Sequence, residues 1–226
     1  MASQDLVAQP RPHYPTQAAR RADLVVHLVG LSLAGVGAVV LLALAVAAGR
    51  ISVVVGVAIY AAGLIAMLAL SLAYNFARAS RQPFLNRLDR SGIFLMIAGS
   101  YTPFTTQRLT GAWAIGMTAL VWALAIGGAV GKLFLGRLPD WIWTLVYVGF
   151  GWVALIALRP LIQGVPVVAL ALLAAGGLIY TTGALIYHSR LPYRRAIWHG
   201  FVVTAAAAHY AAICAGVVLA RPLLAQ

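Results

Sequence analysis

Long apolar runs separated by short polar or basic segments set the pattern of this chain. Crossing the hydrocarbon core of a bilayer takes about 20 residues of helix, and seven runs come close to or exceed that length. They cover residues 24–49, 51–75, 91–107, 113–135, 141–158, 166–188 and 196–220. Before them, residues 1–22 contain three prolines and three arginines, which predicts a disordered polar arm. The pattern therefore predicts an all-α integral membrane domain over residues 23–226, a bundle of seven transmembrane helices.

The composition supports a membrane protein. Of the 226 residues, 63% are hydrophobic and 9% are charged, with a mean hydropathy of +0.94. So few polar side chains cannot cover a soluble globule. The net charge of +12 comes from residues in the segments between apolar runs rather than on one basic face, which argues against nucleic-acid binding. The single cysteine, Cys214, lies within an apolar run and excludes an intrachain disulfide or a thiolate metal cluster.

The basic residues also predict an orientation. Twelve lie on the side of the N-terminus: Arg11, Arg20, Arg21, Arg78, Arg81, Arg87, Arg90, Lys132, Arg137, Arg190, Arg194 and Arg195. Four lie on the other side: Arg50, Arg108, Arg159 and Arg221. Since cytoplasmic loops carry the excess of Lys and Arg, we expect the N-terminus in the cytoplasm and the C-terminus outside.

Polar residues within the apolar runs are the candidates for chemistry. Three pairs stand at i, i+4 spacing, which places both members on one helix face. The pairs are Asp23 and His27, Ser71 and Asn75, and Arg195 and His199. One further acid, Asp89, is isolated at the start of the third run. All belong to the cytoplasmic end in the expected topology, so they could meet in one layer. The alternative is a set of ordinary interfacial residues, with Asp89 solvated and Arg195 extending to the lipid headgroups.

Several strings resemble the hemolysin III family of bacterial membrane proteins, which is related to the progestin and adiponectin receptors. They are Ser71-Leu-Ala-Tyr-Asn75, Leu88-Asp-Arg-Ser-Gly-Ile-Phe94, Ala98-Gly-Ser-Tyr-Thr-Pro-Phe104, and Ile197-Trp-His199 with His209 and Tyr210. His27-Leu-Val-Gly30 and Gly177-Leu-Ile-Tyr-Thr-Thr-Gly183 fit the same pattern. The resemblance implies a location in the bacterial plasma (inner) membrane.

The resemblance also implies a zinc site at the cytoplasmic end. In the family, one histidine on the second helix and two on the seventh hold the metal, and an aspartate on the third helix holds a zinc-bound water. Such a site suits hydrolysis of a lipid amide, as in ceramidase-like enzymes. Ser71, Asp89 and His199 match this pattern, with Asp89 and Ser71 in the catalytic positions. Asn75 and Arg195 occupy the other two ligand positions, which leaves His27 as a possible substitute ligand.

Three classes of function follow. A non-catalytic or metal-poor member would use the charge of Arg195 in place of the metal; we favour this class. The alternatives are a zinc-dependent lipid-amide hydrolase completed by His27, and a transporter or channel. We expect little or no bound zinc, and a hydrogen bond for His209 within the bundle. We also expect an ion pair between Asp89 and Arg195, either direct or bridged by a single water and supported by Asn75. The sequence names no specific substrate and no oligomeric state, although Gly127-Gly128 and Gly176-Gly177 permit close helix contacts.

Overall fold

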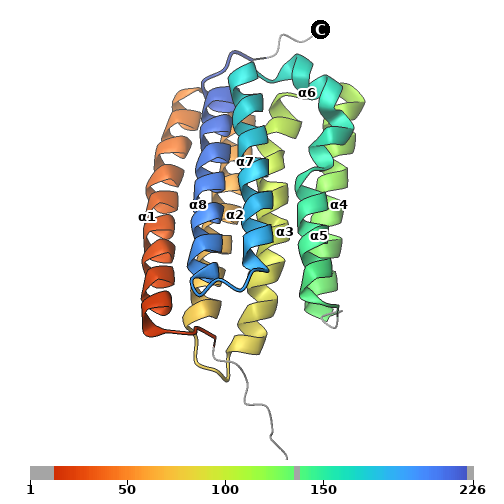
Figure 1. The fold of residues 1–226 in the computed structure, drawn as a ribbon. Coiled ribbons are helices and arrows are strands. Elements are labelled where there is room, and N and C mark those ends of the chain that lie inside the picture. The colour runs from red at the N-terminus through yellow and green to blue at the C-terminus, as the bar shows by residue number, and fades with distance from the viewer. Residues whose placement is uncertain (1–12, 135–137, 223–226) are drawn as a thin grey trace, which may run out of the picture.

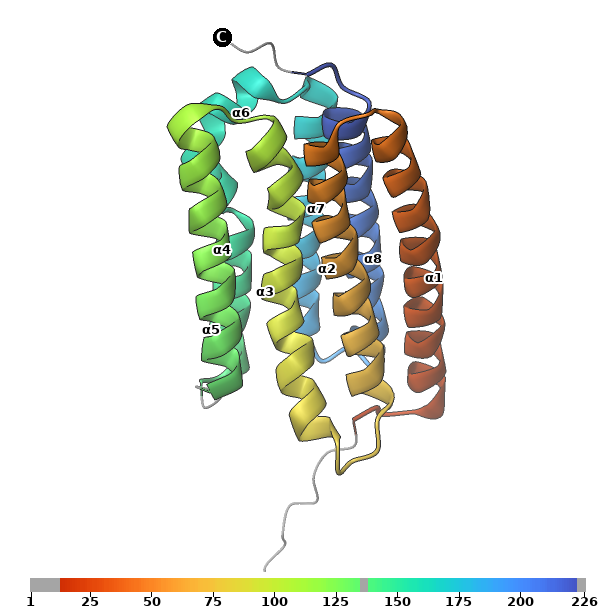
Figure 2. The same ribbon diagram turned by 180° about the vertical axis from the view of Figure 1, so that it is seen from behind.

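The fold is a bundle of long helices that stand side by side, as a computed structural model of residues 13–134 and 138–222 shows (Figure 1). The elements are α1 (Gln17–Ala47), α2 (Ile51–Phe76), α3 (Gln82–Gln107), α4 (Gly111–Phe134), α5 (Asp140–Gly151), the 3-10 helix η1 (Val153–Ala157), α6 (Leu158–Gly164), α7 (Val167–Tyr187), α8 (Arg194–Ile213) and the π-helical turn η2 (Cys214–Val218). Seen from behind, α2 and α3 lie between α1 and the α4–α5 pair (Figure 2). All described regular structure is helical, as the apolar pattern predicted.

Six of the described helices are long and apolar enough to cross a membrane: α1, α2, α4, the α5–η1–α6 segment, α7, and α8 with η2. α3 is not among them, although it has 26 residues and packs between α2 and α4. Its sequence is more polar, and several of its hydroxyl groups donate to carbonyl groups one turn earlier, as Thr102 does to Ala98 O at 2.8 Å. The predicted helix over residues 91–107 therefore exists, within a longer one.

Two helices, α1 and α3, begin about two turns or more earlier than predicted, at residues 17 and 82 rather than 24 and 91. α1 begins at Gln17, inside the expected disordered arm, because the hydroxyl of Thr16 caps it by accepting a hydrogen bond from Ala19 N at 3.0 Å. Residues 1–12 of that arm lie outside the described residues. α3 begins at Gln82, with Pro83 in its first turn, where a missing N–H costs nothing. Asp89 consequently lies two turns inside α3 rather than at its start, which corrects the expectation.

The segment predicted as one helix over residues 141–158 is broken. α5 ends at Gly151, the chain continues through η1, and α6 extends to Gly164 (Figure 1). The helical segment therefore continues beyond the predicted end at residue 158, and Pro160 lies in the first turn of α6, a position that tolerates proline. At the C-terminal end, α8 gives way to η2 at Cys214, within the predicted range of 196–220.

α1 shows how the bundle faces its surroundings. Its exposed face carries large apolar side chains, among them Val25, Val29, Leu33 and Val36. Its buried face carries mostly small or polar residues: Ala19, Asp23, His27, Gly30, Ala34, Ala38, Leu41 and Ala45. Small residues let helices approach closely, and an apolar outer face suits lipid, so α1 has the distribution of a membrane-spanning helix.

Two of the glycines noted in the sequence make close contacts within the chain. A Cβ at Gly128 of α4 would overlap the Phe94 ring of α3, and a Cβ at Gly176 of α7 would overlap the His209 ring of α8. His209 Nε2 lies 3.4 Å from Leu173 O, which confirms the hydrogen bond expected within the bundle. These glycines therefore serve helix packing inside one molecule.

Candidate functional site

The polar residues singled out in the sequence come together at one end of the bundle. Six of the seven line a single cavity of about 190 Å³: His27 from α1, Ser71 and Asn75 from α2, Asp89 from α3, and Arg195 and His199 from α8. The seventh, Asp23, lies behind the two histidines and has no exposed surface. The i, i+4 spacing of each pair produced this convergence, because each helix directs both members toward the same neighbours.

Asp23 anchors the cluster from α1. One carboxylate oxygen, Oδ1, accepts a hydrogen bond from His199 Nδ1 at 2.6 Å, and the other, Oδ2, accepts one from the hydroxyl of Tyr14. His27 Nδ1 lies 3.7 Å from Oδ1 but makes its hydrogen bond, at 2.8 Å, to the backbone carbonyl of Asp23. A buried carboxylate needs such partners, since burying it alone would cost several kcal/mol.

These contacts fix the proton positions on both rings. A carbonyl and a carboxylate only accept hydrogen bonds, so Nδ1 of His27 and Nδ1 of His199 each carry a proton. In the neutral rings both Nε2 atoms then present lone pairs, and both face the hydroxyl of Ser71. The distances from Ser71 Oγ are 3.1 Å to His27 Nε2 and 3.4 Å to His199 Nε2. The two ring centroids are 4.1 Å apart. The Ser71 hydroxyl therefore lies next to two potential bases, His27 and His199.

Arg195 makes different contacts from those predicted. Its Nη1 donates to Asn75 Oδ1 at 3.3 Å and its Nε donates to the backbone carbonyl of His13 at 3.1 Å. Among the described residues, the ion pairs involve Asp23 and Asp140 but not Asp89, so the direct form of the predicted Asp89–Arg195 pair is wrong. The physical reason is that two other acceptors, the Asn75 amide oxygen and the His13 carbonyl, take up the guanidinium.

Asp89 still faces the same cavity, where it is partly buried. The neighbouring Arg90 pairs with Asp140 of α5 through both carboxylate oxygens, one of the two contacts measuring 3.0 Å. The cavity lining thus contains one guanidinium–carboxylate pair, Arg90 with Asp140, and two further opposite charges, Asp89 and Arg195, that do not touch.

Two residues of the site were missed because they fall in the arm predicted to be disordered. His13 Nε2 donates to Asn75 Oδ1 at 2.9 Å, and Tyr14 donates to Asp23. Burial, and then the Arg195 guanidinium, lowers the pKa of His13. Burial, and then the hydrogen bond to Asp23, raises the pKa of the Tyr14 phenol. The only sequence signal for these two residues was that both carry ring side chains just before Thr16, which caps α1.

The side chains present do not fit the zinc site that the resemblance implies. Asn75 and Arg195 hold two of its three ligand positions, and a guanidinium has no lone pair to donate and repels a cation. Asp23, His27 and His199 do offer one donor atom each within 4.8 Å of one another. However, both Nδ1 atoms carry protons toward Asp23, so only the two Nε2 atoms are free, where a catalytic zinc needs three protein ligands.

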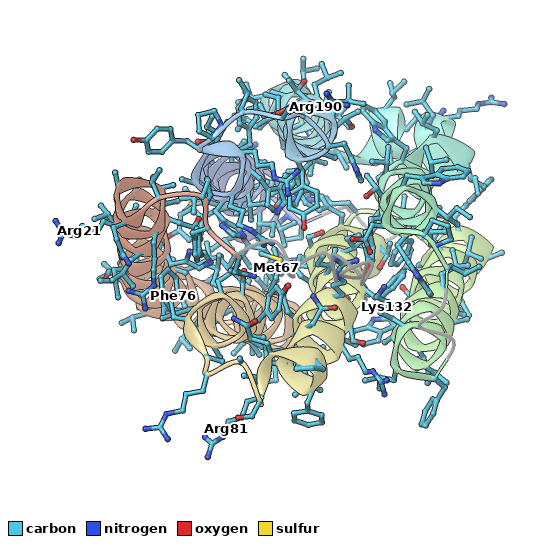
Figure 3. All side chains as sticks on the ribbon, turned by 60° about the horizontal axis from the view of Figure 1, so that its bottom comes forward. Arg21, Met67, Phe76, Arg81, Lys132 and Arg190 are labelled. Atoms are coloured by element: carbon cyan, nitrogen blue, oxygen red, sulfur yellow. The ribbon has the colours of Figure 1, made fainter. Side chains whose placement is uncertain are left out.

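Away from this polar end the cavity walls are mostly apolar. Its walls include Met67, Met96, Trp152, Tyr180 and Val202, contributed by α2, α3, the turn after α5, α7 and α8. Figure 3 looks onto the bundle from the end that carries the site, with Met67 near the middle of the ring of helices and Arg21, Arg81 and Arg190 at its periphery. The site is therefore the polar end of a mostly apolar cavity inside the bundle.

Comparisons with known proteins agree with this architecture. The family model described as "Haemolysin-III related" matches residues 21–210. Hemolysin-3 of Bacillus cereus is 33% identical over 184 residues, which covers 80% of this chain and 84% of that protein. The Hemolysin-3 homolog of Bacillus subtilis (strain 168) is 31% identical over 191 residues, covering 84% of this chain and 90% of the relative.

A human protein is also similar. The monocyte to macrophage differentiation factor of Homo sapiens is 30% identical over 163 residues, covering 69% of this chain and 67% of that protein. The matched region of the family model includes all seven polar residues that the sequence singled out, and it confirms the resemblance found in the sequence. The chain is a membrane protein of the haemolysin-III related family.

Proposed function

We propose that this protein binds a neutral single-chain lipid in a site that works without a metal ion. The observation that carries the proposal is the position of Arg195, which spans from Asn75 to the backbone of His13. A guanidinium–amide pair thereby occupies both ligand positions that differ from the family pattern. The guanidinium supplies the positive charge that a metal would otherwise supply to a carbonyl group.

The charges around the cavity favour a neutral headgroup. Asp89 and Arg195 face the same space with opposite charges and without a direct contact. An anionic head would be repelled by Asp89, and a cationic head by Arg195. A head with both a carbonyl and an N–H or O–H group, such as an acyl amide or a monoacylglycerol, would satisfy both. The apolar walls would take its acyl chain.

The membrane arrangement completes the proposal. α3 would cross the bilayer as a seventh span, because it is as long as its neighbours and packs between two helices that are membrane-competent. The twelve-to-four division of Lys and Arg supports a cytoplasmic N-terminus and an external C-terminus. The lipid site would then open near the cytoplasmic leaflet of the bacterial inner membrane.

Lipid binding can be tested by native mass spectrometry of the protein in detergent, with monodecanoylglycerol, decanoate and decyltrimethylammonium as ligands. We expect saturable binding of the neutral lipid and weaker binding of both ions. Ala184→Phe, which fills the cavity wall, should abolish this binding. Ala171→Phe on the exposed face of the same helix is the matched control and should leave it unchanged. Equal binding of all three ligands, or binding that survives Ala184→Phe, would contradict the proposal.

Arg195 has its own test. A hydrogen bond to a charged group contributes about 1.5–3 kcal/mol, so Arg195→Gln should weaken binding roughly 10- to 100-fold. Arg194→Gln, which changes the exposed neighbouring arginine, is the control. Equal affinities of the wild type and Arg195→Gln would remove Arg195 from the headgroup site.

A second candidate is a metal-dependent hydrolase with an unusual ligand set. It is favoured by the proximity of Asp23, His27 and His199, whose donor atoms lie within 4.8 Å of one another. It would require both imidazole rings to give up their Nδ1 protons or to turn. The zinc content of the purified protein distinguishes the two candidates.

A further inference from the structure

Ser71 occupies a position that lipid binding alone does not require. Its hydroxyl lies at one end of a chain of contacts that runs from Ser71 Oγ to His199 Nε2 at 3.4 Å, and from His199 Nδ1 to Asp23 Oδ1 at 2.6 Å. The three residues come from α2, α8 and α1. A hydroxyl, an imidazole and a buried carboxylate in this order are the parts of a nucleophile, a general base and a carboxylate that orients the base.

We propose that Ser71 is a nucleophile, with His199 as its base and Asp23 as the positioning residue, and that it hydrolyses the acyl bond of the lipid held in the cavity. This inference rests on the proposed lipid binding, because the cavity delivers the acyl carbonyl to Ser71. The 3.4 Å separation of Ser71 and His199 is long for a hydrogen bond, but such contacts commonly tighten only when substrate is bound.

His199 suits the role of base better than His27 does. Both Nε2 atoms face Ser71, and His27 is nearer, at 3.1 Å. When a ring accepts the serine proton it becomes a cation, and His199 then donates directly to the carboxylate of Asp23. His27 Nδ1 instead donates to the neutral backbone carbonyl of Asp23, with the carboxylate at 3.7 Å. A carboxylate in direct contact stabilises the imidazolium more strongly.

Donors for the developing negative charge lie beside Ser71. Asn75 Nδ2 is 3.4 Å from Ser71 Oγ. Within the described part of the chain, Arg195 uses only Nε and Nη1 in hydrogen bonds, which leaves Nη2 to donate to a ligand. Arg195, Asn75 and Ser71 line the same cavity. Such donors stabilise the oxyanion that forms when a serine attacks a carbonyl.

The reaction balances with the lipid and water alone. Ser71 Oγ would bond to the acyl carbon while its proton passes to His199 Nε2. Collapse of the tetrahedral intermediate would break the bond to the headgroup alcohol or amine, which leaves with the proton from His199. Water, deprotonated by the same nitrogen, would then attack the acyl-serine and release a fatty acid with Ser71 restored.

Decyl fluorophosphonate tests this directly, because a nucleophilic serine displaces its fluoride and retains the phosphonyl group. We expect one adduct on the wild type, located at Ser71 by peptide mapping. Ser71→Ala should give none. The control Ser91→Ala changes a different buried serine, which lies in α3, and should react like the wild type. His199→Gln should slow labelling by roughly 10²- to 10⁴-fold. His27→Gln should slow it far less.

The kinetics of labelling show whether Asp23 positions His199 for catalysis or only stabilises the fold. Asp23→Asn should lower the limiting rate of inactivation while leaving the concentration for half-maximal rate unchanged, since the cavity remains. The binding of monodecanoylglycerol is measured on the same samples. No adduct at Ser71 on a wild type that still binds this lipid would overturn the nucleophile and leave the proposed function standing. Loss of lipid binding would overturn both, and an adduct mapped to another residue would overturn the assignment of Ser71.

Discussion

The contact between Asp23 and His199 should dominate the stability of the polar site. Asp23 is fully buried and its carboxylate accepts from both His199 Nδ1, at 2.6 Å, and Tyr14. A hydrogen bond to a charged group contributes about 1.5–3 kcal/mol, and an asparagine can keep only one accepting oxygen. Asp23→Asn should therefore destabilise the protein by about 1.5–3 kcal/mol, since it loses one of the two bonds.

A double-mutant cycle assigns this energy to the pair. We expect Asp23→Asn and His199→Gln to show a coupling energy of about 1.5–3 kcal/mol, measured from reversible unfolding in mixed detergent–SDS micelles. The matched control is the cycle of Asp23→Asn with His27→Gln. It should show coupling below about 0.5 kcal/mol, because His27 bonds to the backbone carbonyl of residue 23, which both variants keep. Additive effects of Asp23 and His199, or equal coupling in the two cycles, would refute the assigned contacts.

Three further outcomes follow from other parts of the molecule. Gly128→Ala should destabilise by about 1–3 kcal/mol, because the added methyl overlaps Phe94, whereas Gly127→Ala meets no neighbour and should be nearly neutral in thermal unfolding. Burial lowers the pKa of His13 from its usual 6.5. The unfolded chain therefore takes up this proton before the folded protein does, so the contribution of His13 to the folded state is complete above about pH 6.5 and is lost as the pH falls below it. His13→Gln should flatten that part of the pH profile of Tm. A reporter joined to the C-terminus should be active only if it works outside the cytoplasm, whereas one in the loop between α2 and α3 should report cytoplasm, and the reverse pattern would contradict the proposed orientation.

The sequence predicted the helical class and the convergence of the site because both follow from periodicity. Apolar runs reveal membrane helices, and the i, i+4 spacing of Asp23 with His27 shows which residues share a face. The start of α3 was missed because residues 82–90 are polar and basic and were interpreted as a loop. A helix that extends beyond the apolar region gives no hydropathy signal there.

The contacts of the site were less predictable. Arg195 was expected to meet Asp89, but a long side chain has several partners within reach, and periodicity gives its helix and depth rather than its direction. His13 and Tyr14 were missed because their order comes from contacts with α1, α2 and α8 rather than from local propensity. The link from Ser71 through His199 to Asp23 joins residues from three helices, so it became visible only in three dimensions.

The central claim is that Arg195, with Asn75, takes the place of a metal ion in this site. Elemental analysis of the purified protein after mild chelation tests it most directly, with the double variant Asn75→His and Arg195→His as the positive control. We expect far less than one zinc per chain in the wild type and close to one in the double variant, which restores the family's three histidine positions. One zinc per wild-type chain that resists chelation would contradict the account and would point to Asp23, His27 and His199 as candidate ligands.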